Sequence, residues 1–296
     1  MPSTKTVNRR SRTELVCSVG SGRRPQRTSL AQMIRKNHVL EEQIAELRRR
    51  HDELQRNFFE AAQMQRRLCG PGHIVRSPFE FAGEIFPVRH LSGDFISSCE
   101  HGAELVFAIG DIEGKGLHAA MWFTHLLAAI RLQVLKGKQP ALAVSAINRD
   151  LCKLQSAPPL TTLFLARLNR ETGRLVYCNA GHPAAQVLRH DGTVERLQEG
   201  GPVMGVVPRA RFSRGEVTLE PGDSLLAYSD GVVECRNQSG VEFGAERLVT
   251  AAKKCQERSA RAMLFSVLGA AADFASNQHE DDMGLLVLRR QFEDGV

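Results

Sequence analysis

The chain has 296 residues, 42% of them hydrophobic and 24% charged, an ordinary globular mixture that excludes a wholly disordered or collagen-like protein. Its net charge of +6 is uneven, because residues 1–68 carry a balance of +8 and the rest of the chain a balance of −2. Seven scattered cysteines without a C-x-x-C pair argue against a thiolate zinc site and a disulfide framework, and no apolar run reaches the ~18 residues of a membrane span. We therefore expect a cytoplasmic protein with no membrane span.

Residues 1–28 are rich in Ser, Arg and Gly and contain few large apolar side chains, so we expect a disordered basic tail. Basic segments attract nucleic acids and anionic membranes. No aromatic residue is interleaved with these arginines, which favours a solvated tail over a nucleic-acid-binding arm. A nucleic-acid partner is therefore not expected, and a coiled-coil nucleic-acid-binding dimer is kept only as an alternative.

Residues 29–69 carry the pattern of a long linker helix. Nine of twelve positions spaced by three and four are apolar; the twelve are Leu30, Met33, Asn37, Leu40, Ile44, Leu47, His51, Leu54, Phe58, Ala61, Gln65 and Leu68. Five such heptads predict a left-handed coiled coil, with Asn37 as a polar residue that fixes its register. The alternative is an amphipathic helix packed on the rest of its own chain. Because the stripe is narrow, we favour a parallel homodimer through residues 30–68, with the helix ending at Gly70-Pro71-Gly72.

From residue 73 onward the pattern changes to strands with inserted helices. Five apolar runs are predicted strands: Glu104–Asp111, Thr161–Leu168, Arg174–Ala180, Asp223–Asp230 and Met283–Arg289. Turn residues at 169–173, 190–192 and 220–222 suggest antiparallel hairpins. Helices are expected over roughly 117–136, 140–154 and, with an interruption, 244–276. Strands that pair with sequence neighbours, with helices in blocks, predict an α+β sandwich over residues 73–292.

Acidic residues stand where predicted strands end or begin. Asp111 and Asp230 each close an apolar strand, Asp94 follows a glycine in Ser92-Gly-Asp-Phe95, and Asp281 and Asp282 precede the last strand. A carboxylate at the end of a buried strand is unfavourable unless a positive charge meets it, and hard divalent cations are the natural partners of such oxygen clusters. Each Asp-Gly pair alone is a common turn dipeptide, so the signal lies in the ordered set.

Residues 79–290 resemble the bacterial SpoIIE/RsbU-type branch of the PPM/PP2C metal-dependent protein phosphatases. The matching segments stand in family order: Ser92-Gly-Asp-Phe95, Gly110-Asp-Ile-Glu-Gly-Lys-Gly-Leu-His-Ala-Ala120, Thr161-Thr-Leu-Phe164, Asn179-Ala-Gly-His-Pro183, Gly201-Pro-Val-Met-Gly-Val206, Pro221-Gly-Asp-Ser-Leu-Leu-Ala-Tyr-Ser-Asp-Gly-Val-Val-Glu234, Phe243-Gly244 and Asp281-Asp-Met283. The resemblance implies a PP2C-like αββα sandwich preceded by the coiled-coil helix.

The resemblance also implies a site for two divalent cations, Mn²⁺ or Mg²⁺. Asp111 would bridge both cations, with the Ile112 carbonyl as a further ligand. Asp230 and Asp281 would hold the second cation, Asp94 would coordinate directly or through water, and Asp282 is counted among the metal ligands. Such a pair lowers the pKa of water, so that a hydroxide attacks phosphorus in line, and neutralises charge on the phosphoryl oxygens.

Arg89 is a candidate phosphate clamp, because a guanidinium fork matches phosphate oxygens, although a solvated surface arginine is an equal alternative. His182 resembles a structural turn residue of the family more than a general acid. Four positions depart from the family pattern, none of them a predicted metal ligand: Ser92, Ile96, Ser97 and Gly284. They leave room for weakened metal affinity.

The resemblance implies a phosphoserine or phosphothreonine substrate on a regulatory protein, of the anti-sigma-factor-antagonist type found in partner-switching pathways. A pseudophosphatase scaffold that binds a phosphoprotein without hydrolysis is the main alternative, and retention of the aspartates argues against it. No sensor domain is evident in the sequence, so the helix of residues 29–69 is the candidate regulatory element. We hypothesise that it repositions the segment bearing Asp94, or the helix after Gly116, and so gates metal binding.

Overall fold

The computed structural model describes residues 29–88, 91–114, 116–153, 158–276 and 280–292. The predicted basic tail, the Arg89 phosphate clamp and Cys17 therefore lie outside the described residues. The chain divides into two compact units, residues 1–53 and 54–296, and the second holds every predicted site residue. None of the described helices is both long and apolar enough to cross a bilayer.

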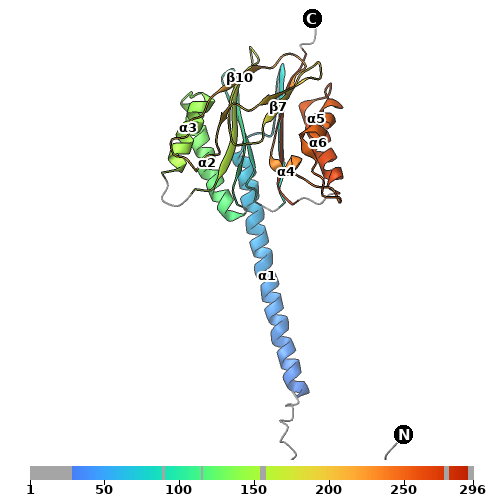
Figure 1. Ribbon diagram of the computed structural model, residues 1–296. Coiled ribbons are helices and arrows are strands. Elements are labelled where there is room, and N and C mark those ends of the chain that lie inside the picture. The colour runs from blue at the N-terminus through green and yellow to red at the C-terminus, as the bar shows by residue number, and fades with distance from the viewer. Residues whose placement is uncertain (1–28, 89–90, 115, 154–157, 277–279, 293–296) are drawn as a thin grey trace, which may run out of the picture. The chain divides into compact units, whose positions relative to one another are not determined.

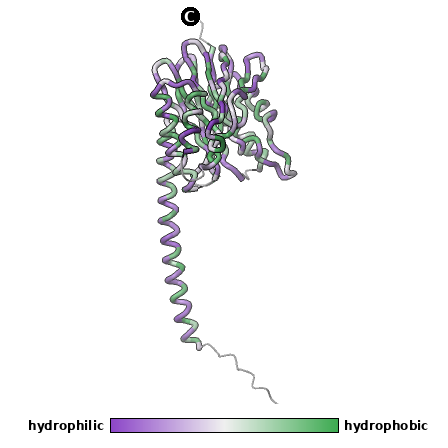
Figure 2. The backbone as a smooth tube through the Cα atoms, turned by 60° about the vertical axis from the view of Figure 1, so that its left-hand side comes forward, coloured by the Kyte–Doolittle hydropathy of each residue, from purple (hydrophilic) through white to green (hydrophobic). Residues whose placement is uncertain are grey.

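Helix α1 (Leu30–Leu68) confirms the predicted long helix. A reciprocal cap begins it, because Ser29 Oγ accepts a hydrogen bond from the Gln32 N–H and Gln32 Oε1 accepts one from the Ser29 N–H. None of its residues is buried, and hydrophobic positions recur along a mostly hydrophilic helix (Figure 2). The chain leaves the helix at Gly70, whose φ of +89° suits glycine. The homodimer through this stripe stays a prediction.

The body contains two mainly antiparallel sheets (Figure 1). One has the strand order β1-β2-β12-β11-β7-β8: His73–Arg76, Phe79–Phe86, Met283–Arg290, Ser224–Tyr228, Ala185–Leu188 and Val194–Leu197. The other has the order β10-β6-β5-β4-β3: Gly215–Thr218, Arg174–Ala180, Thr161–Asn169, Glu104–Ile112 and Phe95–His101. The short β9 (Gly200–Gly201) pairs in parallel with β6.

Three apolar clusters separate the layers. The central cluster joins the inner faces of both sheets and includes Phe81, Phe107 and Leu286. Helices α2 (Leu117–Leu135) and α3 (Pro140–Leu151) cover the β4-containing sheet. Helices α4 (Asp230–Val233), α5 (Gly244–Lys253) and α6 (Ala260–Phe274) cover the β12-containing sheet. The order helix, sheet, sheet, helix confirms the predicted αββα sandwich (Figure 1).

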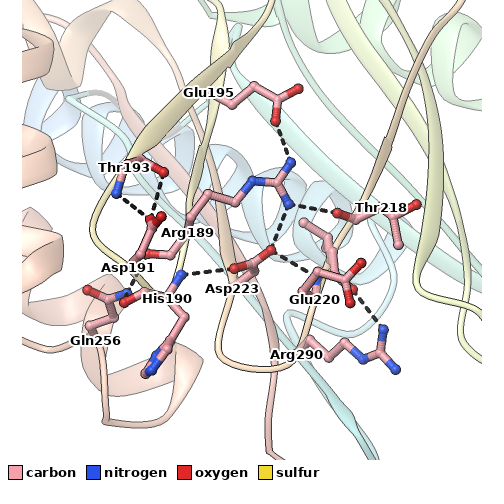
Figure 3. Close-up of polar contacts among 11 residues, drawn as sticks. Arg189, His190, Asp191, Thr193, Glu195, Thr218, Glu220, Asp223, Gln256 and Arg290 are labelled. Atoms are coloured by element: carbon pink, nitrogen blue, oxygen red, sulfur yellow. Dashed lines mark hydrogen bonds and ion pairs between the residues drawn. The ribbon is translucent and has the colours of Figure 1, made fainter.

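The turn at Glu220–Gly222 corrects one predicted hairpin. It joins β10 in one sheet to β11 in the other, so these two strands do not pair. Buried Asp223 holds this crossing, because its Oδ2 lies 2.7 Å from Arg189 Nη1 and its Oδ1 accepts from the His190 N–H at 2.9 Å (Figure 3). Arg189 also pairs with Glu195. The turn residues were predicted, but the change of sheet depends on these long-range contacts.

Candidate active site

One cavity of about 350 Å³ lies where strand ends of both sheets meet. Its wall combines the segment before β3, the end of β4 with the loop that follows, the start of β5, the segment after β9 and the segment before β12. The lining residues are Gly93, Asp111, Ile112, Glu113, Gly114, Leu160, Thr162, Val203, Asp281 and Asp282. Residues from the two sheets therefore converge. Of the predicted aspartates, Asp111, Asp281 and Asp282 line this cavity, and Asp94 and Asp230 are not among its lining residues. No arginine or lysine belongs to the described part of this wall, and the predicted clamp Arg89 is not among the described residues.

Asp111 is half-buried near the end of the β4–β5 pairing, directly opposite Thr162. Its N–H donates to Thr162 Oγ1 at 3.2 Å. The Ile112 N–H donates to the Gly93 carbonyl at 3.2 Å, which brings the segment bearing Asp94 against the loop after β4. A Cβ atom on Gly93 would lie 2.6 Å from the Ile112 carbonyl oxygen and 2.9 Å from Asp111 Oδ1. Glycine at 93 therefore permits the close approach of two predicted ligand segments.

Asp94 is only 4% exposed, and its Oδ2 has no hydrogen-bond partner among the described residues. Burial raises the pKa of this carboxyl well above its usual range, and the charges of Asp111, Asp282 and Asp230 raise it further, while the Ser229 hydroxyl lowers it. The Oδ2 atom lies 3.5 Å from where a Cβ on Gly284 would stand, so the family departure at 284 leaves space beside Asp94. A buried carboxylate oxygen without a donor is costly unless a cation meets it or the acid takes up a proton.

Both carboxylate oxygens of Asp282 accept hydrogen bonds. The Val88 N–H donates to Oδ1 at 2.7 Å, and Ser92 Oγ donates to Oδ2 at 2.6 Å. Ser92, one of the departures from the family pattern, thus forms a direct hydrogen bond to Asp282. These contacts fasten the segment before Asp94 to the start of β12, and they give Asp282 a positioning function whether or not it also meets a metal.

Asp230 and Asp281 flank the same strand ends. Asp230 is the first residue of α4, two residues after β11 ends, and its Oδ1 accepts from the Gly231 N–H at 2.8 Å. Asp281 is exposed, and its Oδ1 accepts from the Asp282 N–H at 3.0 Å. A Cβ on Gly231 would lie 2.1 Å from the Asp282 carbonyl oxygen, so glycine lets the two segments touch. The predicted strand to Asp230 is corrected, because the aspartate begins a helix.

The aspartates share one electrostatic environment. Burial, followed by the charges of Asp230 and Asp281, raises the pKa of Asp111 to about 6. Among the described residues, no group of three or more Asp, Glu, His or Cys side chains is already arranged to hold a metal ion. Burial and mutual repulsion therefore oppose ionisation of Asp111 and Asp94, and a bound cation would favour their charged forms. This donor set, with the unpartnered Asp94 oxygen, fits hard divalent cations.

His182 supports the site from beneath. It is 5% exposed, its Nδ1 lies 2.9 Å from Thr162 Oγ1, and Asn179 holds its main chain on both sides. Burial lowers the pKa of His182 to about 3, so the ring is neutral near pH 7. The Thr162 hydroxyl can then donate a hydrogen bond to His182 Nδ1 while it accepts one from the Asp111 N–H. This arrangement requires that the His182 proton be on Nε2. Sequence reasoning assigned His182 a structural turn; its link to Asp111 through Thr162 was missed, although both motifs were noted.

We predict that His182 makes stability depend on pH. In the unfolded chain the His182 ring has a pKa near 6.5, and in the fold its pKa is about 3. Between these values the unfolded state binds more protons, so stability is lost as the pH falls below 6.5. The contribution of His182 alone should approach about 1.4 kcal/mol per pH unit, and the raised pKa of Asp111 opposes it between pH 6 and 4. Urea unfolding between pH 6.5 and 4.5 measures the sum, and over this range His182→Asn should lose less stability than wild type. His101→Asn, at the exposed end of β3, is the matched control, and equal slopes for all three proteins would refute the assignment.

The family model described as Stage II sporulation protein E (SpoIIE) matches residues 101–291, more than half of the chain. The chain belongs to the SpoIIE family. The predicted resemblance to PPM/PP2C-type phosphatases is thereby confirmed, and so is the predicted enzyme class, a PPM-family protein serine/threonine phosphatase.

Similar proteins agree with membership of the SpoIIE family. The chain is 27% identical over 233 residues to phosphoserine phosphatase RsbU of Bacillus subtilis, a match that covers 78% of this chain and 69% of RsbU. The SiaA-PP2C domain of Pseudomonas aeruginosa superposes with a TM-score of 0.69 at 17% identity and covers 81% of this chain and 98% of that domain. RsbX, solved in complex with magnesium, gives a TM-score of 0.57 at 14% identity over 73% of this chain and 97% of RsbX. The two structural matches show the shared fold.

Proposed function

We propose that this SpoIIE-family chain hydrolyses phosphoserine or phosphothreonine on a regulatory protein, using two divalent cations, Mn²⁺ or Mg²⁺. The observation that carries the proposal is a cavity lined by Asp111, Asp281 and Asp282, together with a buried Asp94 oxygen that has no hydrogen-bond partner among the described residues. Phosphoserine carries nearly two negative charges, which an uncompensated carboxylate cavity would repel. Cations between the carboxylates and the phosphate remove that conflict.

Each predicted ligand keeps its role in the proposal. Asp111 and the Ile112 carbonyl would hold one cation, Asp111 would also reach the second with Asp230 and Asp281, and Asp94 would meet a cation or a water through its unpartnered Oδ2. Asp282 remains a predicted ligand, although its hydrogen bonds to Val88 and Ser92 favour a positioning function. When bound, the cations would activate water and neutralise charge on the phosphoryl group.

The chain's own contribution is to fix the carboxylates before the substrate arrives. Thr162 and neutral His182 hold the Asp111 main chain, and Ser92 holds Asp282. Ser229, fully buried, accepts from the Gly284 N–H at 2.8 Å and so fastens the end of β11 to the start of β12. Such preorganisation lowers the cost of arranging charges during phosphoryl transfer.

The substrate that we propose is a phosphorylated anti-sigma-factor antagonist in a partner-switching pathway. The support is similarity to RsbU, a phosphoserine phosphatase. The cytoplasmic location likewise stays a prediction.

Turnover of p-nitrophenyl phosphate and of a phosphoserine peptide, with Mn²⁺ or with EDTA, tests the proposal. We expect Mn²⁺-dependent hydrolysis of both substrates and none above background in EDTA. Tight phosphopeptide binding without hydrolysis at any Mn²⁺ or Mg²⁺ concentration would instead establish the pseudophosphatase alternative.

The last turns of α1 contact the segment that bears Asp94. Gln65 Nε2 donates to the Ser92 carbonyl at 3.0 Å, and the Cys69 carbonyl accepts from the Ser98 N–H at 3.0 Å. The Leu68 carbonyl also accepts from the Arg131 guanidinium of α2. These contacts support the hypothesis that the helix gates metal binding.

We predict that Gln65→Ala raises the Mn²⁺ concentration for half-maximal activity by about three- to tenfold, because the segment from Ser92 to Asp94 loses one anchor worth about 1 kcal/mol. Gln43→Ala, at an exposed α1 position, is the matched control. A Mn²⁺ titration of phosphatase activity measures both. Superimposable curves for Gln65→Ala and wild type would remove this contact from the gating hypothesis.

A further inference from the structure

Two apolar side chains stand in the wall of an otherwise polar cavity. Leu160 is 43% exposed and Val203 is half-buried. The third apolar residue of the wall, Ile112, is 1% exposed and so offers mainly its backbone. All the other lining residues are acids, Thr162 or glycines. An exposed leucine is ordinary on a protein surface, but its place beside the aspartates puts it within reach of whatever binds there.

Leu160 is held in that wall by Glu113. The Glu113 N–H donates to the Leu160 carbonyl at 2.8 Å, and the Leu160 N–H donates to Glu113 Oε2 at 3.1 Å. Both main-chain polar groups of Leu160 are therefore satisfied by one residue. Because Glu113 follows Asp111 and Ile112 directly, the clamp fixes the leucine relative to the predicted metal ligands.

The neighbouring Val203 segment is anchored just as firmly. Met204 and Thr161 exchange two backbone hydrogen bonds, of 2.9 and 3.2 Å. Asn148 of α3, 1% exposed, accepts from the Gly205 N–H at 3.0 Å and donates to the Val207 carbonyl at 2.8 Å. A Cβ on Gly205 would stand 3.0 Å from the Pro159 carbonyl oxygen, so the two segments touch. Leu160 and Val203 thus belong to one braced structure, which we name the apolar wall.

We propose that the apolar wall of Leu160 and Val203 is a specificity subsite that binds an apolar side chain adjacent to the phosphorylated residue, with Glu113 as its positioning residue. This inference rests on the proposed phosphatase function. Cations and carboxylates recognise the phosphate of any phosphopeptide equally, so they carry no information about neighbouring residues. Adjacent Cα atoms are only about 3.8 Å apart, so a flanking side chain reaches the wall of the same cavity.

The energetic reason is burial of apolar surface. A flanking leucine or valine that covers Leu160 removes apolar area of both side chains from water, whereas a serine or lysine at that position does not. Hydrophobic contacts of this size discriminate between substrates by roughly tenfold. The braced main chain means that little ordering is required when the substrate binds.

The test compares kcat/KM of the full chain with Mn²⁺ on phosphoserine peptides that differ only in one flanking residue, Leu or Ser, placed before or after the phosphoserine. Wild type should prefer Leu over Ser by about tenfold on one of the two sides. Leu160→Ala should reduce that ratio to below about threefold, by loss on the Leu peptide alone. Leu132→Ala, an exposed leucine of α2 outside the cavity, should leave the ratio at its wild-type value.

Glu113 provides a second, independent readout. Glu113→Gln keeps an oxygen that can accept from the Leu160 N–H and should preserve the preference, whereas Glu113→Ala should lose it. If Glu113 only stabilised the fold, Glu113→Gln and Glu113→Ala would both be less stable than wild type. Their Leu-to-Ser ratios of kcat/KM would then be the same. If wild type hydrolyses p-nitrophenyl phosphate and the peptides but shows no preference for Leu over Ser, this inference alone is overturned. An unchanged Leu-to-Ser ratio in Leu160→Ala would overturn it as well. No Mn²⁺-dependent turnover of any substrate would overturn the proposed function, and this inference with it.

Discussion

Asp111→Asn is expected to lower Mn²⁺-dependent phosphatase activity by at least about 10³-fold and, in the same protein, to raise the stability of the metal-free fold. The first effect follows because Asp111 is the predicted ligand shared by both cations, and an amide oxygen carries no charge to hold them. Without the Asp111 carboxylate the chain would hold the cations less well, and the activated water that they would supply would be lost.

The second effect follows from the sign of the pKa shift. The pKa of Asp111 is about 6 in the fold against 3.8 for a free side chain, so the folded state binds more protons between these values. Stability is therefore lost as the pH rises from about 4 to 6, and the loss persists above that window. The asparagine side chain would not ionise, so the variant should be more stable at pH 7.5 by about 1 kcal/mol or more, and the advantage should vanish near pH 4.

A phosphatase assay with Mn²⁺ measures the first effect, and urea unfolding in EDTA and in Mn²⁺ measures the second. Excess Mn²⁺ should stabilise wild type in proportion to its occupancy and leave Asp111→Asn unchanged, which reverses the order of the two proteins. Asp150→Asn is the matched control, because Asp150 is an exposed residue of α3 whose ion pair with Lys153 spans 3.4 Å. A variant that is less stable than wild type in EDTA at pH 7.5, or that retains more than about a tenth of the activity, would contradict the shared-ligand assignment.

The sequence predicted the fold well where local pattern determines it. Apolar strands closed by Asp111, the α1 stripe and the glycine stop at Gly70 each depend on neighbours in the chain, and each is found in the structure. The predicted hairpin at Glu220–Gly222 was wrong because the pairing of its strands depends on contacts between residues far apart in the chain. A turn pattern indicates reversal, but the choice of sheet depends on Asp223 meeting Arg189 across 34 positions.

The candidate site shows the same difference between features set by local sequence and features set by long-range contacts. Its acids could be named from their places at strand ends, because carboxylates there need a cation. Supporting residues could not, because their function lies in contacts between distant segments. Ser92 was read as a departure from the family, yet its hydroxyl binds Asp282 across 190 positions. Asn148 and Glu113 were assigned no function of their own, since a helix asparagine and a loop glutamate are ordinary residues until their partners are known.

The close approach at Gly93 leads to the second large prediction: Gly93→Ala should raise the Mn²⁺ concentration for half-maximal activity by more than about 100-fold. A methyl group at 93 would meet the Ile112 carbonyl oxygen at 2.6 Å, Asp111 Oδ1 at 2.9 Å and the Gly114 carbonyl oxygen at 3.0 Å. All three atoms belong to the segment from Asp111 to Gly114, at the end of β4, which carries the shared ligand. This segment must move away, and the hydrogen bond from the Ile112 N–H to the Gly93 carbonyl must lengthen from 3.2 Å.

Separating the two ligand segments affects metal binding more than folding. We expect the metal-free variant to lose about 1–3 kcal/mol, the usual cost of an overpacked contact. Gly269→Ala is the matched control, because a Cβ there meets no atom within 4 Å and the residue lies inside α6, where alanine should stabilise the fold by about 0.5–1 kcal/mol. Isothermal titration with Mn²⁺ reports affinity without relying on turnover. If Gly93→Ala bound Mn²⁺ as tightly as wild type, the loop of Asp111 and the segment of Asp94 would not share a cation.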